Sequence, residues 1–327
     1  MVPADTYTTP VRLRRGGTYP RLRMGALTEQ LRNGATLVLD AVDEFHDPID
    51  ALAAGLEREL REHVQVNAYG SWGSTRGFDL HWDDHDVLVV QVAGRKRWQI
   101  WGPTRRWPMF RDIEPNTTPP EKPLAELMLT DGDVLSIPRG WWHIATAVDE
   151  PSLHLTAGIT QDTGIDLLTW WVDELRADER FRRDLPRFAD EQTQQAHLKE
   201  LMQVMGERWD EDLLRRFFDA QDALAPPRAR PSLPWAATPE LLPSGDDARV
   251  CLLVPRAVLS TNDDTVALAA DGQRWTFARA AEPLLRALMT GEALGIGELH
   301  ALADQLDAAT VRAFCGQLVA QGVAAVA

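Results

Sequence analysis

The region between about residues 62 and 160 constrains the fold most, because it is a series of short, strand-like runs separated by turn residues. The runs are β-branched or alternate between apolar and polar residues, and in chain order they read EHVQVNAYG, GFDLHWD, DVLVVQVAG, RKRWQIWGP, AELMLTDGD, DVLSIP, WWHIATAV and SLHLTAGI. Many short strands at this spacing are typical of a β-barrel or sandwich. We therefore expect residues 1–161 to form a barrel. Helices over residues 26–34 and 47–63 should flank it, the second with Asp47 as its N-cap before Pro48.

The run GFDLHWD carries two residues that could bind a metal. A strand places residues two apart on one face, so His81 and Asp83 should point together. His143 follows a Pro-Arg-Gly turn on another expected strand and could supply a third ligand. Two histidines and one carboxylate on one face leave coordination positions open, which suits non-haem Fe(II) and oxygen chemistry. His85 has the same strand parity, so a zinc site of His81, Asp83 and His85 is the alternative.

A lysine in the run RKRWQI points to an anion. The alternation places Lys96 on the same inward face as Trp98 and Ile100. Burying an unpaired ammonium costs several kcal/mol, so we expect an anionic partner. The chain has only three lysines, which makes one at this position notable. The alternative is a lysine that extends to the barrel rim and keeps its charge in water.

Two further runs would place polar side chains inside the barrel. Gln65, Asn67 and Tyr69 share one face of their strand, and His154 and Thr156 lie on a similar face with Ser152. Polar side chains inside a barrel indicate a ligand or water. We expect His154 to be a structural histidine.

The chain becomes helical after Ile159. Apolar residues form one stripe at positions 165, 168, 172 and 175, and the segments AHLKELMQVMGERW and DEDLLRRFFDAQDAL are amphipathic. Residues 162–224 could pack on the barrel or on a second copy of themselves, so we expect a helical dimerisation region and a homodimer. Residues 225–243 contain six prolines and are expected to be a linker.

Residues 244–327 are strand-like first and helical afterwards, an order that predicts a winged-helix-like domain. This segment holds six arginines and no lysine against ten acidic residues, so reading DNA is not its expected role. The whole chain carries a formal net charge of −15, which disfavours nucleic acid and anionic lipid as partners and favours a basic one.

The remaining composition favours a protein of the cytoplasm. No stretch reaches the roughly 20 apolar residues that a membrane helix needs, and no apolar region follows the N-terminal arginines as in a secretion signal. The two cysteines, Cys251 and Cys315, have neither zinc-cluster nor disulfide-framework spacing.

Taken together, NAYGSWGSTRGFDLHWDDHDVLVVQVAGRKRWQIW, GDVLSIPRGWWHIA and SLHLTAGI closely resemble the JmjC-type ribosomal oxygenases, which are cupin-like protein hydroxylases. The motifs cover about residues 60 to 160, and the helical block and C-terminal segment extend the likeness over nearly the whole chain. The resemblance implies a mixed α and β architecture. It comprises a double-stranded β-helix barrel, a helical dimerisation region and a C-terminal winged helix.

The resemblance also implies roles for individual residues. The iron ligands of the family fall on His81, Asp83 and His143, and its basic anchor for the distal carboxylate of 2-oxoglutarate falls on Lys96. By the same likeness Asn67 lies near the cosubstrate, and an aromatic residue, Tyr69, lines the substrate side. Related proteins commonly have a serine where this chain has Gly158, so a hydroxyl contact is missing there.

The function so implied is an Fe(II)- and 2-oxoglutarate-dependent dioxygenase that hydroxylates a side chain of a protein or peptide, for example of a ribosomal protein. Gly158 leaves open the same chemistry on a biosynthetic peptide or small molecule. From a different class, a non-catalytic cupin that binds metal and a partner protein is the alternative. A DNA-binding regulator is the least favoured function.

Overall fold

The computed structural model describes residues 2–73, 78–109, 118–148, 150–243 and 248–326. It divides into two compact units, which we describe separately. The first comprises Met1–Leu56 and His63–Gln161, and the second comprises Glu57–Glu62 and Asp162–Ala327.

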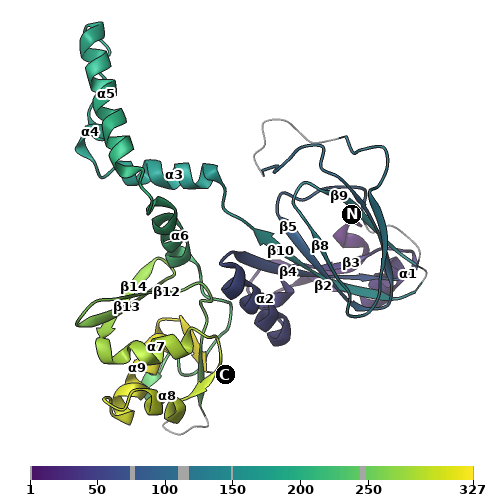
Figure 1. Cartoon of the computed structure of the whole chain (residues 1–327). Helices are drawn as coiled ribbons and strands as arrows, with labels where there is room; N and C mark the ends of the chain where they lie inside the picture. The colour runs from purple at the N-terminus through teal and green to yellow at the C-terminus, as the bar shows by residue number, and fades with distance from the viewer. Residues whose placement is uncertain (1, 74–77, 110–117, 149, 244–247, 327) are drawn as a thin grey trace. The chain divides into compact units, whose positions relative to one another are not determined.

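The first unit is built on two antiparallel sheets, and Figure 1 shows their strands curving into a barrel. The larger sheet has the order β3 (Leu37–Leu39), β4 (His63–Ser71), β10 (Ser152–Thr160), β5 (Asp86–Ala93), β8 (Val134–Ile137). The smaller has the order β7 (Ala125–Leu129), β6 (Lys96–Trp101), β9 (Trp142–Ala147). Apolar side chains of both sheets, among them Val89, Trp98 and Ile137, pack together between them.

Strand β4 shows how alternating apolar and polar residues form the wall of the barrel. Val64, Val66 and Ala68 pack on Ala53 of helix α2 (Asp47–Leu60), so one face of the strand belongs to a hydrophobic core. The residues between them face the barrel interior, as the period of two requires. Each strand of this kind therefore separates a core from a polar cavity.

Seven of the eight expected strand runs form strands in the structure, and the exception is the run that carries the metal-binding pair. The expectation of a strand there is wrong: among its described residues, only His81 makes a β-bridge, to His143, and the rest is irregular. Strand β3 and the N-terminal hairpin of β1 (Thr8–Arg12) and β2 (Thr18–Leu22) were not predicted from the sequence.

The expected flanking helices are present as α1 (Met24–Arg32) and α2. Asp47 is the first residue of α2 and not its N-cap, so that expectation is wrong by one position. No helix among the described residues is long and apolar enough to cross a membrane.

The second unit begins with helices and ends with a mixed segment. Helices α3 (Gly164–Leu175), α4 (Glu179–Arg182), α5 (Glu191–Arg208) and α6 (Leu213–Leu224) come first. Two small sheets follow, with orders β15 (Leu294–Gly295), β11 (Arg249–Leu252), β16 (Ala324–Val326) and β12 (Val258–Thr261), β13 (Thr265–Ala270), β14 (Gln273–Ala278). Helices α7 (Glu282–Leu288), α8 (Ile296–Leu302) and α9 (Ala308–Ala320) complete the unit.

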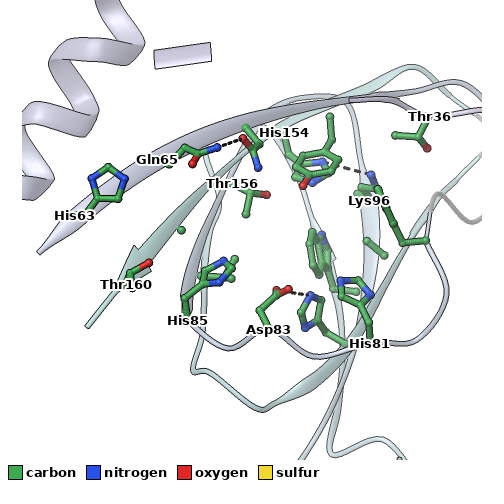
Figure 2. A pocket seen from close by; sticks show the side chains of 18 residues that line it. Thr36, His63, Gln65, His81, Asp83, His85, Lys96, His154, Thr156 and Thr160 are labelled. Atoms are coloured by element: carbon green, nitrogen blue, oxygen red, sulfur yellow. Dashed lines mark hydrogen bonds and ion pairs between the residues drawn. The ribbon is translucent and has the colours of Figure 1, made fainter. Parts of the chain in front are cut away.

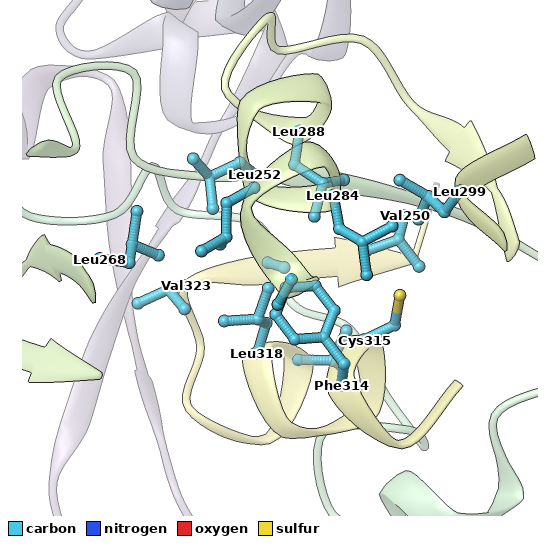
Figure 3. Close-up of a cluster of buried hydrophobic side chains, with 14 of the residues drawn as sticks. Val250, Leu252, Leu268, Leu284, Leu288, Leu299, Phe314, Cys315, Leu318 and Val323 are labelled. Atoms are coloured by element: carbon cyan, nitrogen blue, oxygen red, sulfur yellow. The ribbon is translucent and has the colours of Figure 1, made fainter. Parts of the chain in front are cut away.

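One hydrophobic core unites the C-terminal part of this unit (Figure 3). Leu284 and Leu288 of α7 meet Leu299 of α8 and Leu318 of α9, all fully buried. Residues 225–243, expected to be a linker, have one short 3-10 helix, Pro239–Leu241, and Leu242 joins the same core. The first residues of the expected winged-helix-like segment, 244–247, lie outside the described residues.

Candidate metal centre and its cavity

A cavity of about 530 Å³ opens inside the barrel, lined by residues from both sheets and from the loop before β5. Figure 2 shows that Lys96 and Thr36 lie at one end, and His63 and Thr160 at the other. Asp83 lies between these ends, with His81 on the Lys96 side of it. The volume and mixed polar lining are those of a small-molecule site.

Three side chains of the cavity wall meet as a potential metal site. One ligand atom each of His81, Asp83 and His143 lies within 4.8 Å of the others, and Asp83 Oδ2 is 3.5 Å from His143 Nε2. Two backbone hydrogen bonds between His81 and His143 form the β-bridge that fixes the two histidines side by side. Gly140 N–H donates to the Asp83 carbonyl at 2.8 Å. This hydrogen bond connects the loop that carries Asp83 to the turn before β9.

Both histidines are oriented for metal binding. Nδ1–H of His81 donates to the Asp79 carbonyl at 2.7 Å, and that of His143 donates to the Trp141 carbonyl at 3.0 Å. These bonds leave each Nε2 as the ligand atom. Burial, with the neighbouring His81 as a second cause, lowers the pKa of His143 and favours the neutral ring that a metal requires. Two imidazoles and a carboxylate on one wall of a cavity fit a metal ion with octahedral coordination, of which the protein occupies one face.

His85 is not part of this cluster among the described residues, so the structure does not bring together the alternative set of His81, Asp83 and His85. Its ring lines the same cavity, with Nδ1–H donating to Asp84 Oδ1 at 3.0 Å.

Lys96 is buried at the far end of the cavity, as its inward position on β6 predicted. The residue is only 3% exposed, and Nζ donates to Ser71 Oγ and to His154 Nδ1, each at 3.3 Å. No carboxylate among the described residues pairs with it, and desolvation lowers its pKa to about 8. The alternative of a lysine that extends to the rim is therefore wrong. A buried ammonium with only neutral partners fits an anionic ligand in the cavity.

His154 has a larger part in the site than the sequence suggested. Its ring stacks on Tyr69 at 4.9 Å between centroids, and burial, with Lys96 as the second cause, lowers its pKa to about 3. The neutral ring can therefore accept a hydrogen bond from the Lys96 ammonium. The alternation of β10 placed His154 inward, but only the register of β10 against β4, which pairs it with Tyr69, revealed the contact.

Tyr69 and Asn67 both line the cavity, as expected. Tyr69 lies at the Lys96 end through its contact with His154, so its assignment to the substrate side stays a prediction. Asn67 Oδ1 accepts a hydrogen bond from the Ala41 backbone N–H at 2.9 Å, which fixes the amide and turns its NH₂ group to other partners.

Comparison with known proteins identifies the barrel. Residues 43–167 match the model of the JmjC domain. The chain is 38% identical over 99 residues to the bifunctional lysine-specific demethylase and histidyl-hydroxylase NO66 of Drosophila persimilis, covering 30% of this chain and 14% of that protein. It is 31% identical over 134 residues to ribosomal oxygenase 1 of Gallus gallus, covering 40% of this chain and 22% of the relative. The chain thus matches less than a quarter of the length of either relative.

The fold comparison reaches further along the chain. The structure of YcfD, a ribosomal oxygenase from Escherichia coli in complex with cobalt and 2-oxoglutarate, matches with a TM-score of 0.57 and 20% identity. The match covers 89% of this chain and 78% of YcfD. Residues 43–167 are therefore a JmjC domain, within a chain that has the mixed α and β, cupin-like fold of a bacterial ribosomal oxygenase.

Proposed function

We propose that this chain is an Fe(II)- and 2-oxoglutarate-dependent oxygenase that hydroxylates a side chain of a protein or peptide. The observation that carries the proposal is one cavity that holds both an open-faced cluster of His81, Asp83 and His143 and a buried Lys96, which has no carboxylate partner among the residues that the structure describes. The names of its relatives, a histidyl-hydroxylase and a ribosomal oxygenase, support a protein substrate such as a ribosomal protein.

Each residue of the cavity then has a definite task. The three ligands hold the metal from one side, so its other side faces the cavity. Lys96 binds the distal carboxylate of 2-oxoglutarate, and its hydrogen bonds to Ser71 and His154 set the position of Nζ. When bound, Fe(II) with 2-oxoglutarate couples O2 to two products: succinate with CO2, and a hydroxyl group in place of one substrate hydrogen.

The proposal is tested by measuring succinate released by the purified chain. Release should require Fe(II), 2-oxoglutarate and O2 together, and turnover without iron would contradict the proposal. Mass spectrometry of ribosomal proteins incubated with the enzyme should then find one added oxygen atom. If metabolites or short biosynthetic peptides are the better substrates, the small-molecule alternative gains. Binding of metal and 2-oxoglutarate without any succinate would favour a non-catalytic cupin.

The affinity for 2-oxoglutarate should depend on pH through Lys96. Its pKa of about 8 in the free protein means that the ammonium is present below pH 8 and lost as the pH rises. The dissociation constant of 2-oxoglutarate should therefore be flat below pH 8 and rise about tenfold from pH 7 to pH 9. Calorimetric titration of the Mn(II)-loaded protein measures this. A Lys96→Met variant should lose the pH dependence, and a slope that persists in that variant would assign it to another group.

We also propose that residues 162–224 form a homodimer. Three of the four residues of the stripe expected from the sequence, Ile165, Leu168 and Val172 of α3, are 43–55% exposed in the single chain, whereas the fourth, Leu175, is buried. Exposed apolar stripes of this kind support contact with a second copy. The C-terminal segment is proposed as winged-helix-like, and its acidic composition supports a role other than binding nucleic acid.

The dimer is tested by sedimentation equilibrium. The wild type should have twice the mass of the 36.5 kDa chain, and Val172→Asp should shift it toward the monomer by placing a charge in the apolar stripe. Glu174→Gln, at another exposed position of α3, is the control and should remain dimeric. A wild type that sediments as a monomer would contradict the proposal.

A further inference from the structure

The first unit has a second hollow, of about 500 Å³, that the proposed reaction does not use. One wall comes from residues 103–107, which follow β6, and the other from residues 138–141, the turn before β9. Asp86, at the start of β5, and Gln161, just after β10, complete the lining. Four separate parts of the chain therefore meet in this hollow.

Close contacts hold the two walls in place. A Cβ atom at Gly140 would lie 2.7 Å from Pro108 Cδ and 3.1 Å from the Arg105 carbonyl oxygen, so the turn packs directly against the other segment. Arg139 N–H donates to Asp86 Oδ1 at 2.8 Å, which joins the same turn to β5. The hollow is therefore a defined part of the fold.

Two guanidinium groups in the hollow lack an anionic partner. Arg106 and Arg139 line it, and neither side chain forms an ion pair with a carboxylate in the part of the chain that the structure describes. Asp86 is the only carboxylate among the described lining residues, so two positive charges face one negative charge. In a chain of net charge −15, such a local positive excess favours an anion at this place. Arginine pairs well with carboxylates because its planar fork matches their two oxygens.

Two indole rings give the hollow an apolar surface beside these charges. Trp107 is 69% exposed, and its backbone φ of 49° lies in the left-handed region, which bulky residues seldom adopt. Strained residues of this kind are concentrated at ligand sites. Trp141, from the other wall, is half-buried. The aliphatic stem of a ligand side chain can pack on such rings while its charged end reaches the arginines.

The hollow adjoins the end of the barrel cavity that lies away from Lys96. His85 lines the cavity, and the next residue, Asp86, lines the hollow. Thr160 and Gln161 are divided in the same way, and Figure 2 shows Thr160 at the end opposite Lys96. Because consecutive Cα atoms are about 3.8 Å apart, a peptide that enters the cavity at this end can reach the hollow within a few residues.

We propose that this hollow is an exosite, a binding site outside the reaction cavity, and that Arg106 and Arg139 bind a carboxylate-bearing residue of the substrate chain there. The inference rests on the proposed function, since it takes the substrate to be a protein or peptide. Single-stranded nucleic acid also combines anions with flat rings, but the net charge of −15 repels its many phosphates. A peptide brings one carboxylate to the two arginines and avoids this repulsion.

The test uses the full chain loaded with Mn(II) and 2-oxoglutarate in the absence of O2, so that Lys96 is occupied and no turnover occurs. Two capped peptides, acetyl-Ala-Ala-Glu-Ala-Ala-amide and its glutamine counterpart, are titrated by calorimetry. Their central side chains are similar in size, and only glutamate is charged. The net charge of the protein alone would make the glutamate peptide the weaker ligand, whereas the exosite should make it bind about tenfold more tightly.

Variants connect this preference to the hollow. Arg106→Gln combined with Arg139→Gln should remove the preference for glutamate, and the fold should survive because neither guanidinium has an ion-pair partner among the described residues. Arg97→Gln, at an exposed position of β6 outside the hollow, is the matched control and should keep the preference. Trp107→Ala should weaken both peptides by a similar factor, since the ring contacts the stem and not the charge.

Succinate release with a mixture of ribosomal proteins connects the hollow to the reaction. The variant with both arginines replaced should need about ten times more of the mixture for its half-maximal rate. Its maximal rate should equal that of the wild type, because the metal cluster and Lys96 are unchanged. A change confined to the half-maximal concentration distinguishes an exosite from damage to the reaction cavity.

The outcomes separate the exosite from the function on which it rests. Equal affinity for the two peptides, or a preference that persists without both arginines, would overturn the inference and leave the proposed function standing. An unchanged half-maximal concentration would also overturn it, since the hollow would then bind a carboxylate from another source. Tighter binding of a five-residue oligouridylate than of the glutamate peptide would make the hollow a nucleic-acid site instead. If no substrate yields succinate, the proposed function fails and the exosite fails with it.

Discussion

Asp83→Ala is expected to abolish the succinate release of the wild-type chain, with a fall of at least about 100-fold. Loss of partners outside the ligand sphere already costs metal sites about 10–100-fold, and Asp83 is the cluster's only carboxylate. Without it, two neutral imidazoles remain, and nothing offsets the charge of Fe(II) on that wall. The measurement is succinate formed at saturating 2-oxoglutarate, together with the Fe(II) dissociation constant.

The fold should survive this change, so lost activity can be assigned to the metal. The hydrogen bond that joins the loop of Asp83 to the turn before β9 is made by the backbone carbonyl of Asp83, which accepts from Gly140 N–H and remains in alanine. Asp79→Ala is the matched control: its side chain is exposed in the same loop, and only its backbone carbonyl contacts His81. Asp79→Ala should keep wild-type activity. Full activity in Asp83→Ala would exclude the proposed ligand set.

Much of the barrel could be predicted because its strands have two different faces. In β4, apolar residues alternate with Gln65, Asn67 and Tyr69, and this period of two predicts both the strand and the direction of its polar side chains. The same rule placed Lys96 inward on β6. Predictions from local patterns of this kind hold in the folded protein, because burial of one strand face fixes the register of the strand.

The metal loop shows where the same rule reaches its limit. His81 and Asp83 do meet, but through a β-bridge to His143 and a loop, because tertiary contacts and not local propensity fix this segment. The contact between His154 and Lys96 could not be predicted from the sequence either, since it joins residues 58 positions apart on different sheets. Gly158 was notable in the sequence because related proteins commonly have a serine, and so a hydroxyl group, at this position. Its packing against the His85 ring needed three-dimensional coordinates.

Lys96→Met is expected to weaken 2-oxoglutarate binding about 100-fold while leaving the protein as stable as the wild type or more stable. A hydrogen bond between charged groups contributes about 1.5–3 kcal/mol. The ammonium donates two of its three N–H groups to Ser71 and His154, so the third is left for the carboxylate. The stability should not fall, because the free protein buries this ammonium without a carboxylate among its described neighbours, and methionine has a similar volume without the desolvation cost. Calorimetry of the Mn(II)-loaded protein gives the affinity, and thermal unfolding gives the stability.

The opposite signs of these two effects make the prediction specific to an anion site. A lysine kept for structural reasons would lower the unfolding temperature when replaced, because Ser71 Oγ and His154 Nδ1 would lose a donor that the fold needs. A lysine kept for a ligand carries a cost in the free protein, and only the bound carboxylate offsets that cost. Arg97→Met, on the exposed face of the same strand, is the matched control and should change neither quantity. Unchanged affinity combined with a lower unfolding temperature in Lys96→Met would therefore remove 2-oxoglutarate from this end of the cavity.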